Sequence, residues 1–404
     1  MDLVSSIKRS SLVHIWFCCV FVLSALIVTT CQCFTLLLWP ISKRLYREAN
    51  GLIITMMWHE LLWLIDYWSG SEVHVYIKDE ELELIGKEHV VLILNHRQDV
   101  DWLVTWQVAE RCNVLRGAKS LMKNELKYVP FFGWSFYLTE QLFVNRDYTR
   151  DKSSLVKHFE NITTFHYPCV TLIFCEGTRY TEEKYKKSQA FAKEKGLPGL
   201  KHHLMPRTKG FNLCMQTYKG KVPYIIDATI AYKDGAVSTL YDLLCGKKFE
   251  YHIYMRALPL DEVPTDTEEA TAEYCHELYR KKDETFQYFL DHNTFEGYDA
   301  ERGHSFLPPT PTPKYVMSFW FLVLGVPLIY YAFVTLLSGS TLLILLVVGA
   351  LYAVFTYTKS IMNVTVSSRG STYGSIKSNG SQGVKNGSVD TNSSEVTAGE
   401  KKED

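Results

Sequence analysis

The sequence predicts an α/β domain with a mostly parallel sheet, anchored by an N-terminal transmembrane helix and a C-terminal transmembrane hairpin. Polar motifs directly follow two of the predicted strands, where α/β folds place ligands and catalytic groups. Strands that alternate with helices are typical of a parallel sheet. The predicted strands are 73–77, 90–94, 170–174 and 224–230, and the predicted helices are about 101–110, 151–165 and 268–290.

The N-terminal apolar segment, residues 12–38, carries no charged residue apart from His14. It exceeds the roughly 20 residues that a spanning helix needs, and it is too long for the core of a signal peptide. We therefore expect a retained anchor, with a buried core helix as the alternative. Residues 51–68 are also apolar, but His59, Glu60 and Asp66 interrupt them. Such charges are costly in hydrocarbon. We therefore expect residues 1–69 to form the anchor followed by an interfacial helix, with a second membrane span as the alternative.

The C-terminal third of the chain divides by composition. The predicted domain covers 70–305, and a Pro-rich linker follows at 306–314. Two apolar runs within 315–358, separated by Ser-Gly-Ser, are long enough for a transmembrane hairpin, in which Pro327 would kink the first helix. Residues 359–404 are rich in Ser, Gly, Asn and Thr, which predicts a disordered tail.

Charge and cysteine content restrict the setting. Lys and Arg number 43 against 44 Asp and Glu, so no net field favours nucleic acid. The 10 cysteines form no paired metal motif, and we expect a cytosol-facing protein without disulfides. Lys401 and Lys402 resemble the dilysine retrieval signal of endoplasmic reticulum membrane proteins. This predicts a multi-pass endoplasmic reticulum protein with its domain and tail facing the cytosol. The Golgi is the alternative location, and the alternative for the two lysines is a charged end on a solvated tail. Glycosylation of the five Asn-x-Ser/Thr triplets would instead place them in the lumen.

The first motif, NHRQDVD at residues 95–101, supplies a base and a carboxylate to orient it. Histidine takes a proton near neutral pH, and a carboxylate on its other nitrogen fixes the tautomer. Asp99 would share a helix face with His96 on one continuous helix. Asp101 would face back if His96 lies on a turn before the helix, so spacing alone leaves both partners open.

The second motif, EGTR at residues 176–179, supplies a cation beside a tight turn. Arg179 can grip a phosphate bidentately, and backbone N–H groups around Gly177 can add donors. The structural alternative for Glu176 is an ion pair that holds Arg179, and this role can coexist with binding. The two motifs together suggest a base that activates a hydroxyl and an anion site that holds the substrate.

These motifs resemble those of the glycerolipid acyltransferases. His96 with Asp101 matches the family's H-x4-D box, 176–179 matches its EGTR box, and FVNR at 143–146 with Gly133 upstream resembles its second box. Residues 176–183, 196–198 and 204–211, together with the hairpin, resemble the gamma/delta type of 1-acyl-sn-glycerol-3-phosphate acyltransferase. One departure is that residues 95–97 with Asp101-Trp102 are closer to the lysocardiolipin acyltransferase branch.

The resemblance implies an α/β acyltransferase domain in which His96 is the general base and Asp101 orients it. A lysophosphatidic acid hydroxyl would attack acyl-CoA to give phosphatidic acid, with Asp99 only a charge near a helix N-terminus. No metal or prosthetic group is implied, because acyl-CoA is a co-substrate, and the bilayer is the remaining partner. The segment 222–226 would contact acyl chains or form a core strand. The implied substrate-binding residues are Glu176, Gly177, Thr178, Arg179, Arg146, Lys123 and Lys209, with a surface role as the alternative for Arg146 and Lys123.

Other functions remain as alternatives. One alternative is that the acceptor is another lysophospholipid, such as lysophosphatidylinositol or lysocardiolipin, which the same chemistry would acylate. A catalytically silent lipid-binding protein would not need His96, Asp101, Glu176 and Arg179 together. A hydrolase would need a nucleophile, and no Gly-x-Ser-x-Gly elbow occurs.

Overall fold

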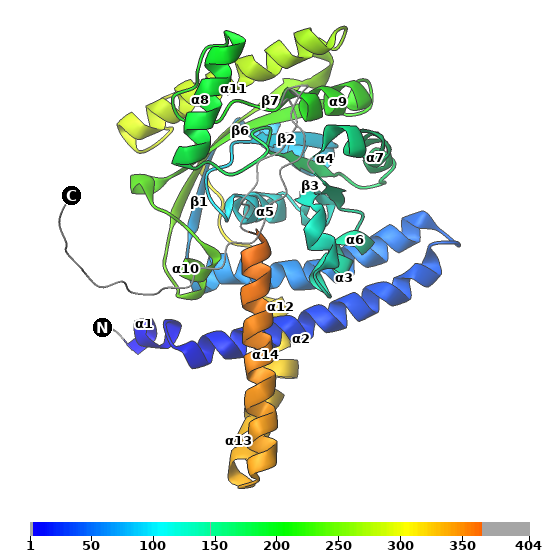
Figure 1. Ribbon diagram of the computed structural model, residues 1–404, viewed down its shortest axis with the longest axis vertical. Coiled ribbons are helices and arrows are strands. Elements are labelled where there is room, and N and C mark those ends of the chain that lie inside the picture. Colours follow the sequence, from blue (N-terminus) through cyan, green and yellow to red (C-terminus); the bar gives the residue numbers. More distant parts are fainter. Residues whose placement is uncertain (1–2, 146, 366–404) are drawn as a thin grey trace, which may run out of the picture. The chain divides into compact units, whose positions relative to one another are not determined.

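The computed structural model describes residues 3–145 and 147–365 (Figure 1). The candidate residue Arg146 and most of the predicted tail, including Lys401 and Lys402, lie outside these described residues. All the elements below belong to one compact unit of the chain, residues 1–374.

Eight strands form one sheet in the order β4-β3-β5-β2-β6-β7-β1-β8. The first five strands in this order are mutually parallel, β7 is antiparallel to β6, β1 is parallel to β7, and β8 is antiparallel to β1. The prediction of a mostly parallel sheet is confirmed, and each predicted strand is present. The strands are β1 (Glu72–Tyr76), β2 (Val90–Leu94), β3 (Ala118–Lys123), β4 (Leu142–Val144), β5 (Val170–Ile173), β6 (Tyr224–Tyr232), β7 (Glu250–Pro259) and β8 (His304–Phe306).

Helices account for most of the remaining described chain, and all three predicted helices of the domain are present. The helices of the domain are α4 (Asp79–Lys87), α5 (Asp101–Arg111), α6 (Phe132–Leu138), α7 (Tyr148–Ile162), α8 (Glu182–Lys195), α9 (Thr208–Tyr218), α10 (Leu240–Leu244) and α11 (Glu268–His292). The flanking helices are α1 (Leu3–Lys8), α2 (Ser11–Thr35), α3 (Lys43–Trp63), α12 (Thr312–Trp320), α13 (Val326–Leu337) and α14 (Thr341–Thr365). Short helical segments are η1 (Leu36–Leu38), η2 (Leu64–Trp68), η3 (Leu115–Gly117), η4 (Asn124–Tyr128), η5 (Lys233–Gly235), η6 (Leu260–Glu262) and η7 (Phe321–Gly325).

The central strands are apolar on both faces because helices cover both faces. Side chains alternate along a strand, so Val90 and Leu92 point to one face of the sheet and Val91 and Ile93 to the other. The first face packs on α5 and α3, and the second packs on α7, α9 and α11 (Figure 1). This continuous apolar character is typical of a parallel sheet buried between two helical layers.

Three helical stretches are long and apolar enough to cross a membrane. They are Ser11–Leu38, Thr312–Leu337 and Thr341–Thr358, which correspond to the predicted anchor and hairpin. The first hairpin helix passes through the π-helical segment η7 just before Pro327, which fits a helix adjusting to a residue without an N–H. Helix α14 continues to Thr365, seven residues beyond the predicted end of the hairpin at 358.

The segment 51–68 is not among these three stretches. Helix α3 and segment η2 instead carry many buried residues. The charged side chains that interrupt it are buried and paired. His59 contacts Glu110 at 3.0 Å, Glu60 accepts from Ser24 at 2.6 Å, and Asp66 pairs with Arg111 at 2.8 Å. Polar partners from α2 and α5 thus join this segment to the domain.

Candidate active site

The site lies at the carboxyl edge of the sheet, where β2, β5 and β6 end side by side. Because β2 pairs in parallel with both neighbours, the residues after these three strands meet at one edge. Asn95, fully buried, joins β2 to β6: its side-chain amide donates to the carbonyl of Ile230 at 3.1 Å and accepts from the N–H of Ile230 at 2.7 Å. These two hydrogen bonds fix the position of the chain just before His96.

His96 lies on the turn before α5, and its Nδ1 is 2.8 Å from Oδ2 of Asp101. The helix begins at Asp101, so the two residues do not share a helical repeat and the carboxylate faces back toward the ring. Asp101 is fully buried, whereas 21% of the His96 side chain is exposed. Of the two carboxylates that spacing left open, the structure places Asp101 against His96.

Asp101 is held by three further donors. Its Oδ2 accepts from the backbone N–H groups of Arg97 at 2.7 Å and Gln98 at 2.9 Å, and its Oδ1 accepts from the hydroxyl of Tyr232. Burial, together with the Asp101 charge, raises the pKa of Tyr232 well above its ordinary value, so the phenol stays a donor. Tyr232 was not predicted as a site residue, although it ends the strand that was expected at 224–230.

The other surroundings of His96 fix its ring and backbone. The ring of Phe174 stacks on the imidazole with a centroid distance of 4.1 Å and an interplanar angle of 23°. The His96 N–H donates to Oε1 of Glu176 at 2.8 Å, and its carbonyl accepts from the N–H of Tyr180 at 2.9 Å. Among the described residues, none forms a hydrogen bond with Nε2. When Nδ1 donates to Asp101, Nε2 therefore carries an available lone pair.

Glu176 has a structural role that the motif did not reveal. It is buried, and its second oxygen accepts from the N–H of Leu204 at 3.4 Å, so it links the end of β5 to the His96 turn and to the loop before α9. The alternative of an ion pair with Arg179 is wrong, because both carboxylate oxygens face backbone donors. Burial raises the pKa of Glu176 to about 8, and the two backbone N–H groups oppose this effect.

The EGTR segment makes the tight turn that its glycine predicted. Gly177 has a φ of 69°, which favours glycine, and its N–H donates to the carbonyl of Phe174 at 3.0 Å. Lys184 donates to Oγ1 of Thr178 at 2.8 Å and to the carbonyl of Arg179 at 3.2 Å. The turn is therefore held from α8.

Arg179 forms its ion pair with Asp99, and both side chains remain about a quarter exposed. Burial lowers the pKa of Arg179 from its ordinary value. Asp99 thus belongs to the second motif in space, although it lies within the first in sequence. A carboxylate occupies the position beside Arg179 that an anionic group of a substrate would need.

The remaining candidates lie farther out. Lys123 ends β3, which pairs in parallel with β5, so it reaches the same edge of the sheet as Glu176. Lys209 is exposed in the first turn of α9, with its amine 5.3 Å from the ring centroid of Tyr148. The segment 222–226 leads into the amino end of β6, at the edge opposite His96, and its side chains Val222, Ile225 and Ile226 are buried. That placement favours the core-strand interpretation.

Helix α11 supplies positioning groups that sequence spacing did not reveal. Asp283 accepts from the N–H groups of Lys201 at 2.6 Å and His202 at 2.8 Å, and the His202 carbonyl accepts from Arg97 at 2.7 Å. The Arg97 guanidinium also lies over the ring of Phe286, 4.6 Å from its centroid. Lys201, His202, Asp283 and Phe286 lie 100 or more positions beyond the first motif, so no local pattern could have connected them with Arg97.

Comparison with known proteins agrees with this architecture. Residues 74–233 match the family model "Acyltransferase", and residues 242–321 match "Acyltransferase C-terminus". The chain is 36% identical over 379 residues to 1-acyl-sn-glycerol-3-phosphate acyltransferase delta of Bos taurus, which covers 94% of this chain and 98% of the relative. It is 35% identical over 376 residues to the gamma protein of Homo sapiens, covering 93% and 98%. The chain therefore belongs to the acyltransferase family that includes the gamma and delta 1-acyl-sn-glycerol-3-phosphate acyltransferases, and it is an acyltransferase.

Proposed function

We propose that this enzyme transfers an acyl group from acyl-CoA to the sn-2 hydroxyl of lysophosphatidic acid, giving phosphatidic acid and CoA. The observation that carries the proposal is the oriented His96–Asp101 pair, with Nε2 of His96 left open at the carboxyl edge of the sheet. The names of the gamma and delta relatives support the choice of acceptor. The chemistry calls for no metal or prosthetic group, because the thioester itself is the activated donor.

The proposed step uses His96 as a general base and then as an acid. Nε2 takes the proton of the acceptor hydroxyl while the oxygen attacks the thioester carbonyl. Asp101 stabilises the imidazolium through Nδ1, as the carboxylate does in other His–Asp pairs. When the tetrahedral intermediate collapses, the carbon–sulfur bond breaks, and the imidazolium returns its proton to the CoA thiolate. No covalent enzyme intermediate forms.

The acceptor phosphate would bind Arg179. Its present partner, Asp99, is partly exposed, so a dianionic phosphate can displace the carboxylate and accept bidentate hydrogen bonds from the guanidinium. The Gly177 turn fixes the backbone beside this cation. Lys123, at the same edge of the sheet, and Arg146 are the proposed secondary cations, and Lys209 is a more distant candidate for the polar end of the acceptor.

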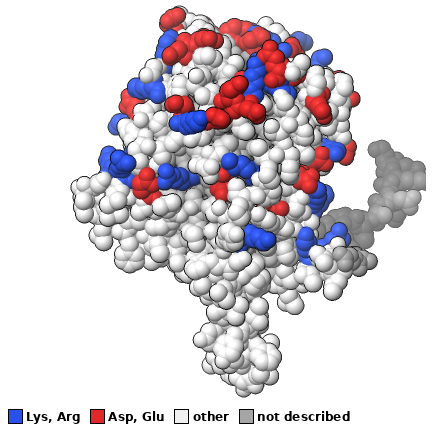
Figure 2. Space-filling model, turned by 180° about the vertical axis from the view of Figure 1, so that it is seen from behind, with Lys and Arg blue, Asp and Glu red and all other residues white. Residues whose placement is uncertain are grey.

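A membrane location suits a lipid acceptor. In Figure 2 the Lys, Arg, Asp and Glu side chains gather over the domain, whereas the hairpin is uncharged on the visible face. We propose that the three apolar stretches anchor the enzyme in the endoplasmic reticulum membrane and that the domain faces the cytosol. The amide of Asn161, the one described sequon in the domain, accepts from Arg47 at 2.9 Å and donates to Glu140, an arrangement that a glycan would disrupt.

The test is acyl transfer by membranes that contain the full chain. Labelled oleoyl-CoA is offered with lysophosphatidic acid, lysophosphatidylinositol or lysocardiolipin, and membranes with the His96→Ala variant at equal expression provide the background. We expect label in phosphatidic acid that depends on His96. Label that enters only another phospholipid would replace the acceptor and keep the mechanism. No His96-dependent label with any acceptor would favour the lipid-binding alternative.

A further inference from the structure

A second cluster of chemical groups lies on β1 and β7, away from His96. Both strands carry a Glu-x-His sequence, and they pair in parallel so that Glu72 lies beside Glu250 and His74 beside His252. Residues two apart on a strand share a face, so the four side chains form a rectangle on the face that packs on α11. In the sheet order, β6 stands between the β7 side of this rectangle and β2, and His96 follows the end of β2.

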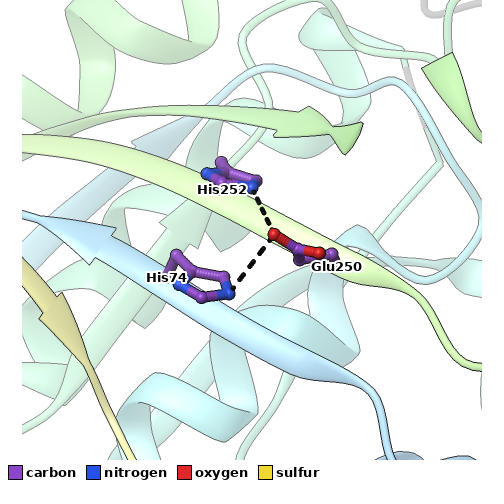
Figure 3. Close-up of side chains that lie close together, drawn as sticks. All are labelled: His74, Glu250 and His252. Atoms are coloured by element: carbon purple, nitrogen blue, oxygen red, sulfur yellow. Dashed lines mark ion pairs between the residues drawn. The ribbon is translucent and has the colours of Figure 1, made fainter. Parts of the chain in front are cut away.

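Three of these side chains converge on one point (Figure 3). Oε1 of Glu250 is 3.4 Å from Nε2 of His252 and 3.6 Å from Nε2 of His74, and the three donor atoms lie within 4.8 Å of one another. Ligands bound to zinc at tetrahedral angles with bonds of 2.0–2.2 Å are about 3.4 Å apart. The two distances to Glu250 already match that spacing, and the two imidazole nitrogens, which lie within 4.8 Å of each other, would approach to about 3.4 Å on a bound ion.

The Nε2 atoms of both histidines are buried and face Oε1 of Glu250, but neither forms a hydrogen bond of normal geometry with any described residue. His252 is only 4% exposed, so solvent does not readily replace the missing partner. Buried polar atoms are normally satisfied, and each exception asks for an explanation.

The outer partners of the two rings fit a metal-binding tautomer. Nδ1 of His252 is 2.9 Å from the hydroxyl of Tyr76, which in turn is 2.9 Å from Oγ1 of Thr294. Nδ1 of His74 is 2.8 Å from Nε2 of His304 on β8. If each Nδ1 donates outward, each Nε2 presents a lone pair to the centre, and such outer hydrogen bonds are the usual support of metal-bound histidines.

Two charged residues, Lys233 and Glu72, lie next to the three side chains and would affect the binding of a metal ion. Lys233 donates to both oxygens of Glu250, at 2.8 and 2.9 Å, and its side chain is 42% exposed, so it can leave. Glu72 holds an oxygen 4.0 Å from Nε2 of His74 and forms an ion pair with Lys248. The Lys233 ammonium therefore lies beside Glu250, where it would compete with a bound metal ion. Glu72 is close enough to His74 to become a fourth metal ligand in place of water.

We propose that His74, Glu250 and His252 form a binding site for a divalent transition metal, with zinc as the best match to the donor set. Two imidazoles and one carboxylate with an open fourth position are a common zinc arrangement. The ion would bridge β1 and β7, whose paired residues lie 178 positions apart in the chain, and would stabilise this side of the sheet.

The experiment uses the full chain in detergent without a polyhistidine tag, stripped with a chelator and then dialysed against Zn²⁺. Bound zinc is measured by mass spectrometry, and the melting temperature is recorded with and without the ion. We expect about one zinc per chain and a higher melting temperature, because a ligand that binds only the folded state stabilises it. Glu250→Gln keeps the side-chain shape and should weaken zinc binding at least about tenfold.

Two further variants make the result decisive. Lys233→Gln removes the competing ammonium at a partly exposed position and should tighten zinc binding several-fold. His292→Gln, at an exposed histidine on α11, is the matched control and should bind zinc as the wild type does. A wild-type chain that retains no zinc overturns the proposal, as does a Glu250→Gln variant with wild-type affinity. If Glu250→Gln does not fold, an unchanged affinity in Lys233→Gln overturns it.

Discussion

The hydroxyl of Tyr232 donates to Oδ1 of Asp101, while Oδ2 of the same carboxylate faces Nδ1 of His96. Tyr232 ends β6 and His96 follows β2, and these strands are direct neighbours in the sheet. The base follows β2, its orienting carboxylate begins α5, and the group that holds this carboxylate ends the neighbouring strand β6.

Tyr232→Phe should slow acyl transfer without changing the site's shape. A hydrogen bond to a charged group contributes about 1.5–3 kcal/mol, so we expect a fall in kcat of about tenfold or more. Because the carboxylate would then hold more negative charge, the acid limb of the kcat/KM profile should move to higher pH. A purely structural tyrosine would lower the amount of folded enzyme and leave the shape of that profile unchanged.

Arg179 and Asp99 should have opposite effects on the acceptor. Arg179→Gln removes the proposed phosphate ligand and should raise the acceptor KM about tenfold or more, with little change in the KM for acyl-CoA. Asp99→Asn removes the competing carboxylate and should lower the acceptor KM up to about fivefold. Steady-state kinetics with both substrates varied would check this pair. Equal effects of the two substitutions, or an unchanged acceptor KM, would move the phosphate site elsewhere.

Glu176 should make the stability of the enzyme fall with rising pH. Its pKa is about 8 in the folded chain against an ordinary value of 4.5, so between these values the folded state holds a proton that the unfolded state has lost. Stability then falls as the pH rises through this window, by up to about 1.4 kcal/mol per pH unit.

Glu176→Gln cannot lose a proton at this position and should flatten that dependence. Melting temperatures measured from about pH 5 to 8 should decline less steeply in the variant than in the wild type. Glu183→Gln, at an exposed glutamate on α8, is the control and should follow the wild type. Parallel curves for Glu176→Gln and the wild type would contradict the raised pKa.

The buried pair Asp66–Arg111 should fasten α3 and η2 to the domain. Both side chains are almost fully buried, and Asp66 also accepts from Gln107 at 2.6 Å. Asp66→Ala would leave Arg111 buried without its carboxylate, at a cost of about 3–5 kcal/mol in the free energy of unfolding. Glu83→Ala, which removes an exposed ion pair with Lys87, should have little effect in the same unfolding experiment.

The sequence allowed the central strands to be predicted because continuous apolar runs bounded by polar motifs leave few alternatives. Strand β3 could not be predicted in this way, because Lys119 interrupts its apolar character. In the structure Lys119 is buried, and its amine donates to the carbonyl of Thr139 at 2.7 Å. Hydropathy treats such a lysine as a surface residue. Only the tertiary contact makes its burial tolerable.

The site could be predicted where its residues are close in sequence, and less well where they are not. Whether His96 meets Asp99 or Asp101 depends on the residue at which α5 begins, and helix boundaries are the least predictable feature of a sequence. The Arg179–Asp99 pair joins residues 80 positions apart, so only the sheet brings them together.

The most direct test of the central claim is the turnover rate of His96→Ala at saturating acyl-CoA and lysophosphatidic acid, in membranes with expression equal to the wild type. General-base catalysis typically contributes about 10²–10⁴-fold, so we predict a loss of at least about a hundredfold with normal membrane insertion. A rate within a few-fold of the wild type would contradict the assignment of His96 as the base.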